Sequence, residues 1–202
     1  MLKQNTLKVV ALIVMSMMIG GCSQSDGFST SASEGPLVID GYTLPPDPGE
    51  AGKSTLLGID SNNNGVRDDV EIYIYKRFQG FENARKDRAI AMQFAKATQI
   101  IIQEPEKAYE NKTYVMMHNA IDCQWYYFNQ HLNTVKDYRM RLEYREKHRI
   151  FDALMEDTIF NTRERLEAYM QYNDSLSGHV YDSRPQVKDK CEVDIDALGN
   201  KW

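Results

Sequence analysis

Oxygen-bearing side chains recur at alternate positions in a short segment near residue 60. The segment begins at Asp60, continues with Asn62, Asn64 and Gly65, and is followed by Glu71. This order satisfies the pattern D-x-[DN]-x-[DN]-G-x5-E, in which alternate side chains turn inward and the glycine permits a sharp bend. Calcium binds about six to eight carboxylate, amide or carbonyl oxygens. The spacing therefore predicts a calcium site in this segment.

Residues 60–71 resemble the calcium loops of EF-hand and dockerin-like proteins. In those loops, three side-chain oxygens come first, a backbone carbonyl and an oxygen or bridging water follow, and a glutamate closes the site with both carboxylate oxygens. The resemblance implies that these ligands come, in that order, from Asp60, Asn62 and Asn64, from Val66 and Asp68, and from Glu71.

Two features differ from a paired EF-hand. Prolines and glycines before Asp60 leave room for only about one or two helical turns, so we expect a loop followed by a single helix. Arg67 stands at the eighth loop position, where paired hands carry an apolar residue, and no second loop follows. A lone site with few charged ligands belongs to the weak extracellular class, with a Kd of about 10⁻⁴ to 10⁻³ M. The alternative is an Asn-Gly turn before a helix whose first turn carries Asp68 and Asp69.

A second charged group lies between residues 136 and 149, where there are six basic and three acidic residues. Arg141, Arg145 and Arg149 recur at every fourth position and therefore share one face of the expected helix. One interpretation is an anion-binding stripe for lipid phosphate, lipopolysaccharide or an acidic cell-wall polymer. The alternative is a solvated face, paired internally with neighbouring charges of opposite sign.

Helical periodicity dominates the chain after the calcium loop. Apolar residues recur at every third or fourth position, and no strand–helix alternation is present. The fold class expected is all-α, a single bundle of about five helices over residues 56–180, with an N-terminal calcium loop and a disulfide-stapled C-terminal tail at 181–202. In the last helix we expect Asn161 and Glu164 to form a cap-like pair and Leu166 and Tyr169 to face inward.

The first two dozen residues determine the expected compartment. Lys3 and Lys8 accompany an apolar run at residues 9–19, which is the layout of a secretory signal and is too short to span a bilayer. The following IGGC, ending at Cys22, resembles the lipobox of bacterial lipoproteins, in which the cysteine is lipidated and becomes the first mature residue. The resemblance implies a lipid anchor in the cell envelope, and Ser23 after the cysteine favours the outer membrane, facing the periplasm. The alternative is an ordinary secretory signal with a chance cysteine.

The remaining cysteines are Cys123, in an expected helix, and Cys191, in the polar tail. Because disulfides persist in oxidising compartments, we predict that these two cysteines pair. The bond would close a long loop and stabilise the fold by roughly 4 kcal/mol. A free buried thiol or a catalytic thiol at Cys123 is the alternative.

The expected domain organisation follows from composition. Residues 1–21 form the signal peptide, residues 22–52 form a lipidated flexible tether rich in Ser, Gly and Pro, and residues 53–202 form the helical domain. The apolar stretch PLVIDGYTL within the tether could be a short strand or a docking segment. Removal of the signal changes the formal net charge from −5 to −7, which argues against a nucleic-acid partner.

Two functions remain open at this stage. The first is a lipid-anchored, calcium-stabilised envelope module that binds an envelope protein or an anionic polymer. The second is a cell-envelope hydrolase acting on cell-wall sugar or peptide through carboxylates among residues 143–164. A carboxylate pair indicates catalysis only when its separation and burial fit the reaction. We therefore favour the module and assign no catalytic residue.

Overall fold

The structure is a computed structural model that describes residues 35–181 and 187–199, without the side chains of residues 131 and 147–155. The expected signal peptide at 1–21 and the lipidated Cys22 lie outside the described residues. Within the described ranges, no helix combines the length and the apolar character needed to cross a bilayer.

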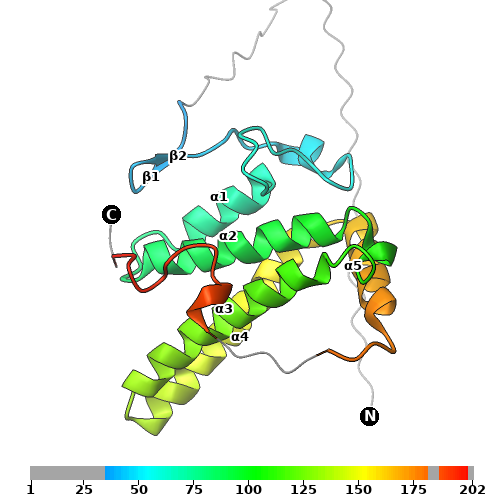
Figure 1. Ribbon diagram of the computed structural model, residues 1–202. Helices are drawn as coiled ribbons and strands as arrows, with labels where there is room; N and C mark the ends of the chain where they lie inside the picture. Colours follow the sequence, from blue (N-terminus) through cyan, green and yellow to red (C-terminus); the bar gives the residue numbers. More distant parts are fainter. Residues whose placement is uncertain (1–34, 182–186, 200–202) are drawn as a thin grey trace, which may run out of the picture. The chain divides into compact units, whose positions relative to one another are not determined.

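The described chain is mostly helical, as the periodicity predicts (Figure 1). Five α-helices are present among the described residues, in agreement with the expected helical bundle of about five helices. Their bounds are α1 Asp68–Arg77, α2 Ala84–Ile101, α3 Tyr114–Thr134, α4 Tyr138–Ile159 and α5 Arg163–Leu176. The shorter elements are β1 Val38–Ile39, β2 Tyr42–Thr43 and the 3₁₀ helices η1 Gly49–Lys53, η2 Pro105–Lys107 and η3 Lys188–Lys190.

The helices pack through apolar faces in which alanine is frequent on α2. Val70 and Ile74 of α1 meet Ala91 and Ala95 of α2, and Ile159 at the end of α4 joins this cluster. Small side chains on α2 let the neighbouring helices approach closely. The other end of α2 packs in a second cluster with α3, α5 and the segment around η2, formed by Ala97, Ile101, Ile102, Ala108, Met117, Ala120, Ala168 and Tyr172.

A small β-hairpin packs on α1 and shortens the expected tether. β1 and β2 pair antiparallel across Asp40 and Gly41, which both have positive φ, as a two-residue type I′ turn requires. Ile39 and Leu44 are buried in a cluster with Ile72 of α1. The prediction that the flexible tether extends to residue 52 is therefore wrong from β1 onward. The apolar stretch folds because its two strands pair with each other and bury one face on α1.

The C-terminal segment is fastened to α2 and α3, as the red segment in Figure 1 indicates. Cys123 and Cys191 form the expected disulfide, with an S–S length of 2.02 Å and a sequence separation of 68. Ile195 is buried beside Cys123 and Ile90. Gln93 of α2 adds two hydrogen bonds, donating to the Lys190 carbonyl at 2.8 Å and accepting from the Glu192 N–H at 3.0 Å. The part of the tail from 187 to 199 is thus a packed element of the fold.

Candidate calcium loop and its arginine network

The candidate calcium loop lies between η1 and α1 and is closed by backbone contacts. The Asp68 N–H donates to the Ile59 carbonyl at 2.8 Å, which joins the two ends of the loop. Asn63 and Gly65 have φ values of 55° and 86°, so the chain turns sharply twice. The Asp60 carboxylate accepts the N–H groups of Asn64 at 3.1 Å and Gly65 at 2.9 Å. These bonds hold the loop in the tight turn that the glycine was expected to permit.

Two predicted ligand side chains converge on Glu71. This residue lies in the first turn of α1 and is fully buried, with an exposed fraction of 0%. Its Oε2 accepts the side-chain amides of Asn62 at 3.0 Å and Asn64 at 2.8 Å. Its Oε1 accepts the hydroxyl of Tyr42, from β2, at 2.7 Å. Burial and this bond to a carboxylate raise the pKa of Tyr42 to about 12.

The remaining predicted ligands lie at the edge of this group. The buried Asp68 accepts the N–H of Ser61 at 3.0 Å. Val66 is also buried, and its N–H donates to Oδ1 of Asn64 at 2.8 Å. Among the described residues, no set of three or more His, Cys, Asp or Glu side chains lies close enough to hold a metal ion. The carboxylates are instead satisfied by N–H and O–H donors from the loop and β2.

The donor set of the loop nevertheless fits calcium in its chemistry. The six predicted ligands all supply oxygen, and none supplies the nitrogen or sulfur that softer metals prefer. Asn62 and Asn64 present their amide nitrogens to Glu71. Rotation about the last side-chain bond exchanges the oxygen and nitrogen of an amide, and this torsion is soft. A cation between these groups would attract the oxygens that the amides now direct elsewhere.

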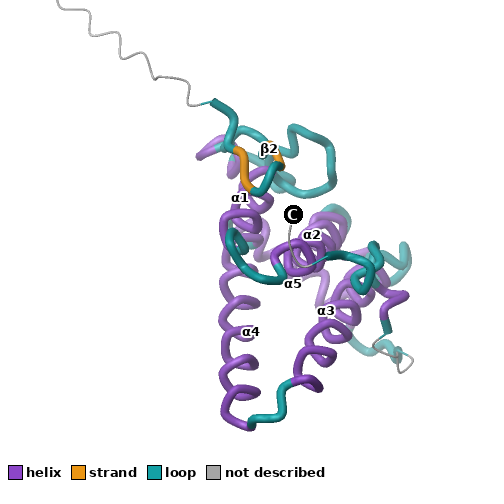
Figure 2. The backbone as a smooth tube through the Cα atoms, turned by 90° about the vertical axis from the view of Figure 1, so that its left-hand side faces the viewer, coloured by secondary structure: helices purple, strands orange, loops and turns teal. Residues whose placement is uncertain are grey.

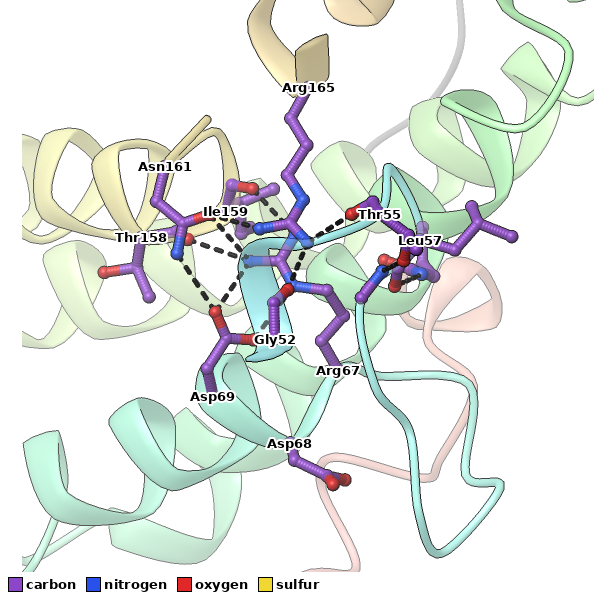
Figure 3. A network of polar contacts seen from close by, with 12 residues as sticks. Gly52, Thr55, Leu57, Arg67, Asp68, Asp69, Thr158, Ile159, Asn161 and Arg165 are labelled. Carbon is purple, nitrogen blue, oxygen red and sulfur yellow. Dashed lines mark hydrogen bonds and ion pairs between the residues drawn. The ribbon is translucent and has the colours of Figure 1, made fainter. Parts of the chain in front are cut away.

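Arg67, inside the loop, reaches a distant helix end (Figure 3). Its guanidinium donates to the carbonyls of Ile159 at 2.9 Å and Thr158 at 3.0 Å, which are among the last of α4. The side chain also makes a bidentate contact with Asp69, with N–O distances of 2.9 and 3.1 Å. The last carbonyls of a helix lack intrahelical partners and carry a partial negative charge, so a buried cation stabilises them. Asp68 points away from this network, toward the loop.

Arg165, in the first turn of α5, holds the segment that precedes the loop. It is fully buried and donates to the carbonyls of Gly52 at 2.6 Å, Thr55 at 3.0 Å and Leu56 at 2.9 Å. It also donates to Oδ1 of Asn161. Since η1 and the following turn bury little apolar surface of their own, these bonds fix their position.

The two arginines share one carboxylate. Asp69 pairs with Arg67, accepts the Asn161 amide at 3.0 Å, and lies near Arg165. Burial raises the pKa of Asp69, but the hydrogen bonds and charge of Arg67 outweigh burial and hold that pKa below its ordinary value. Burial, together with the charge of Arg67, lowers the pKa of Arg165. The positive charge of Arg165 is therefore stabilised largely by the backbone carbonyls to which its guanidinium donates.

The α4–α5 junction differs from the cap that the sequence predicts. Thr162, not Asn161, is the N-cap of α5, and its hydroxyl accepts the N–H of Arg165 at 3.3 Å. Asn161 is used in the arginine network instead. Leu166 is exposed, whereas Arg165 is buried with Ala168 and Tyr172, so the expectation that Leu166 faces inward was wrong.

The residues of the predicted anion-binding stripe lie on α4. Arg141 and Arg145 lie exposed on α4, and the side chain of Arg149 is outside the described residues. A cavity of about 310 Å³ lies among α2, α3, α4 and α5. Among the described residues that line it, Glu156 is the only carboxylate, and it is exposed. The described carboxylates between residues 143 and 164 are all exposed, namely Glu143, Glu146, Glu156, Asp157 and Glu164.

The arginine network was missed by sequence reasoning. In the sequence, Arg67 stands out only as a departure from paired EF-hands, and no role is predicted for Arg165. One available signal was the spacing of Arg165, Ala168 and Tyr172, which places a charged residue in the inward-facing series of α5. Comparison with protein-family models, with curated proteins and with solved structures found no match to this chain.

Proposed function

We propose that residues 60–71 bind one calcium ion and that this ion stabilises a non-enzymatic, lipid-anchored module of the bacterial cell envelope. The observation that carries the proposal is the convergence of Asn62 and Asn64 on one carboxylate oxygen of the buried Glu71. A turn followed by a helix with acids in its first turn gives no reason for this convergence. A calcium loop requires it, because these three side chains are ligands of the same ion.

The bound ion would strengthen contacts far from the loop. Arg67 stands between two predicted ligands, Val66 and Asp68, so fixing the loop fixes the start of the arginine side chain. The guanidinium of Arg67 then holds the last carbonyls of α4. In this proposal calcium has a structural role, and the ion joins the loop, α1 and the α4–α5 junction into one cooperative unit.

The envelope location rests on the resemblance of IGGC at Cys22 to a lipobox and on the predicted signal peptide before it. The disulfide between Cys123 and Cys191 supports the proposal, because such bonds persist outside the reducing cytoplasm. Calcium at millimolar concentration is compatible with such surroundings, where a weak site is occupied.

The module is favoured over the hydrolase by the positions of the carboxylates. Glycosidase chemistry needs two carboxyl groups about 5 to 10 Å apart, at least one of them with a raised pKa. The described carboxylates between residues 143 and 164 are exposed, and Glu156 is the only one of them on the described lining of the 310 Å³ cavity. The exposure of these described carboxylates favours the module, and the side chain of Asp152 lies outside the described residues.

Calorimetric titration of calcium into residues 23–202 tests the proposal. We expect one ion per chain with a Kd of about 10⁻⁴ to 10⁻³ M. Glu71→Gln should weaken binding at least about tenfold, because it removes a charge and a bidentate ligand. Asp60→Asn provides a second variant that keeps a hydrogen-bond acceptor in the loop.

The matched control is Glu82→Gln, which removes an exposed carboxylate outside the loop. Its calcium affinity should equal that of the wild type. Absence of binding at about 10 mM calcium, or equal affinity in the wild type and both loop variants, would show that the loop is not the site.

A further inference from the structure

The connection between α3 and α4 exposes apolar side chains at the end of a helical hairpin. Figure 2 shows the two helices joined at the end that lies away from α1 and the β strands. Tyr138, Met140 and Leu142, in the first turns of α4, have exposed fractions of 65%, 58% and 45%. Every residue from 136 to 143 is exposed. Large apolar side chains that share one exposed helix face, as Tyr138 and Leu142 do, indicate an interaction surface.

The packing of the hairpin defines which face of α4 is free. Tyr144 stacks on Phe128 of α3 with ring centroids 5.2 Å apart, and Leu132 of α3 is buried. With about 100° of rotation per residue, Leu142 lies on nearly the opposite side of α4 from Tyr144, and Tyr138 lies one turn before Leu142. The apolar side chains on the free face therefore do not belong to the contact between the two helices.

Basic side chains flank this apolar face. Helical geometry places Arg141 and Arg145 within about 60° of Tyr138 around the helix axis, and both are exposed. Lys136 and Arg139 are also exposed at the same end of the hairpin. The segment from residue 136 to residue 149 carries six basic and three acidic residues, although the whole chain has a net charge of −5.

The acidic residues of the segment leave an excess of positive charge. Asp137 is the N-cap of α4 and accepts the Met140 N–H at 2.9 Å. Glu143 and Glu146 are exposed on the same helix. Between residues 136 and 146, four basic residues stand against three acidic ones, and the excess increases toward residue 149. The local charge thus complements an anionic partner, opposite to the charge of the protein as a whole.

We propose that this surface, comprising Tyr138, Leu142, Arg141 and Arg145, docks on the anionic face of a lipid bilayer. Tyr138 and Leu142 would enter the headgroup region, while the two arginines pair with lipid phosphates. Aromatic and aliphatic side chains beside arginine are typical of segments that lie in a membrane interface. A soluble acidic polymer would use the arginines but would gain nothing from an exposed leucine. The surface is independent of the calcium loop and would add a second membrane contact to the expected lipid at Cys22.

Vesicle co-sedimentation of residues 23–202 made without lipid tests this inference. We expect binding to phosphatidylcholine vesicles that contain phosphatidylglycerol, weakening as salt rises, and no binding to phosphatidylcholine alone. Arg141→Gln with Arg145→Gln should lower binding at least about tenfold. Tyr138→Ser with Leu142→Ser should lower it at least about fivefold, because the inserted apolar area is lost.

Two double variants on other surfaces serve as controls. Leu166→Ser with Met170→Ser removes exposed apolar side chains from α5, and Lys53→Gln with Lys107→Gln removes exposed charges elsewhere. Both should bind like the wild type, and circular dichroism should show the same helix content for all variants. Absence of binding to anionic vesicles overturns the inference. Loss of binding in the arginine variant with unchanged binding in the Tyr138/Leu142 variant identifies a polyanion site and also overturns it.

Discussion

Nη1 of Arg67 donates to the carbonyl of Ile159 at 2.9 Å, although the two residues are 92 positions apart in the chain. Arg67 belongs to the candidate calcium loop, and Ile159 is the last residue of α4. The contact therefore connects the loop with the junction of two later helices. Arg165, which starts from that junction and reaches back to the carbonyl of Gly52, makes a second connection in the opposite direction. The two arginines add polar connections between segments that also meet in the apolar clusters around Ile159 and Ala168.

Removing Arg67 should strongly destabilise the fold. Arg67→Leu leaves Asp69 without its bidentate partner and leaves two carbonyls of α4 without a donor, and breaking a buried pair in this way costs about 3 to 5 kcal/mol. Urea denaturation in the presence of a calcium chelator measures this loss without a contribution from the ion. The control is Arg163→Leu, whose pair with Glu167 is exposed to solvent and should therefore contribute little to stability. Equal losses in the two variants would contradict the role given to Arg67.

Replacing Gly58 by any residue with a side chain should destabilise the fold. Its φ is +67°, and a Cβ atom there would lie 2.4 Å from Cδ of Arg67 and 2.9 Å from the Gly52 carbonyl oxygen. Gly80 has a similar φ of +76° but open space around it, so Gly80→Ala measures the conformational cost alone, about 1 kcal/mol. Gly58→Ala should cost about 2 kcal/mol more, since the backbone and Arg67 must move. Equal unfolding free energies for the two variants would show that the close approach carries no cost.

The disulfide should stabilise the whole described fold, not only the tail. Replacing both Cys123 and Cys191 with serine should lower the free energy of unfolding by roughly 4 kcal/mol, as expected for a closed loop of this length. Urea denaturation of this variant beside the oxidised wild type measures the effect. Lys188→Gln, a change of an exposed residue in the same tail, is the control. A loss below about 1 kcal/mol would indicate that the packing of Ile195 and the bonds of Gln93 suffice.

Acid should weaken the arginine network through Asp69. Its pKa in the folded state lies below the ordinary value of 3.8. A depressed folded-state pKa stabilises the protein above the unfolded-state value, and this contribution is lost as the pH falls through the folded-state value. We expect the difference in unfolding free energy between the wild type and Asp69→Asn to be constant above about pH 5 and to shrink toward about pH 2. A difference that does not change with pH would contradict the ionised pair with Arg67.

The sequence predicted the elements that depend on local pattern. The helical segments follow from apolar residues at three- and four-residue spacing, and the pairing of Cys123 with Cys191 follows from their number and the expected compartment. The mostly helical character and the number of α-helices therefore agree with expectation within the described residues. The boundary of the tether was wrong, because the short strand considered for PLVIDGYTL is in fact two strands of two residues each, which pair with each other.

Long-range polar contacts were outside the reach of sequence reasoning. The bonds of Arg165 to Gly52, Thr55 and Leu56 span 113, 110 and 109 residues, and no spacing rule relates such distant positions. The side chain of Asn161 was expected to cap α5, but its oxygen accepts hydrogen bonds from the arginines instead. A long-range contact therefore replaces the expected local cap. Thr162 is the N-cap residue of α5, and its hydroxyl accepts the Arg165 N–H. The proximity of Asn62, Asn64 and Glu71 follows from their spacing within one segment, and their role as calcium ligands stays a prediction.

Thermal unfolding of residues 23–202 with calcium and with chelator tests the central claim most directly. At about 10 mM calcium, a site of the weak class adds about 1.5 to 3 kcal/mol, which raises Tm by about 3 to 10 °C in a chain of this size. We predict this rise for the wild type and for Glu82→Gln, and a clearly smaller rise for Glu71→Gln, because a weaker site stabilises the fold less at the same calcium concentration. A wild-type Tm that is the same in calcium and in chelator would contradict the account of a calcium-stabilised module.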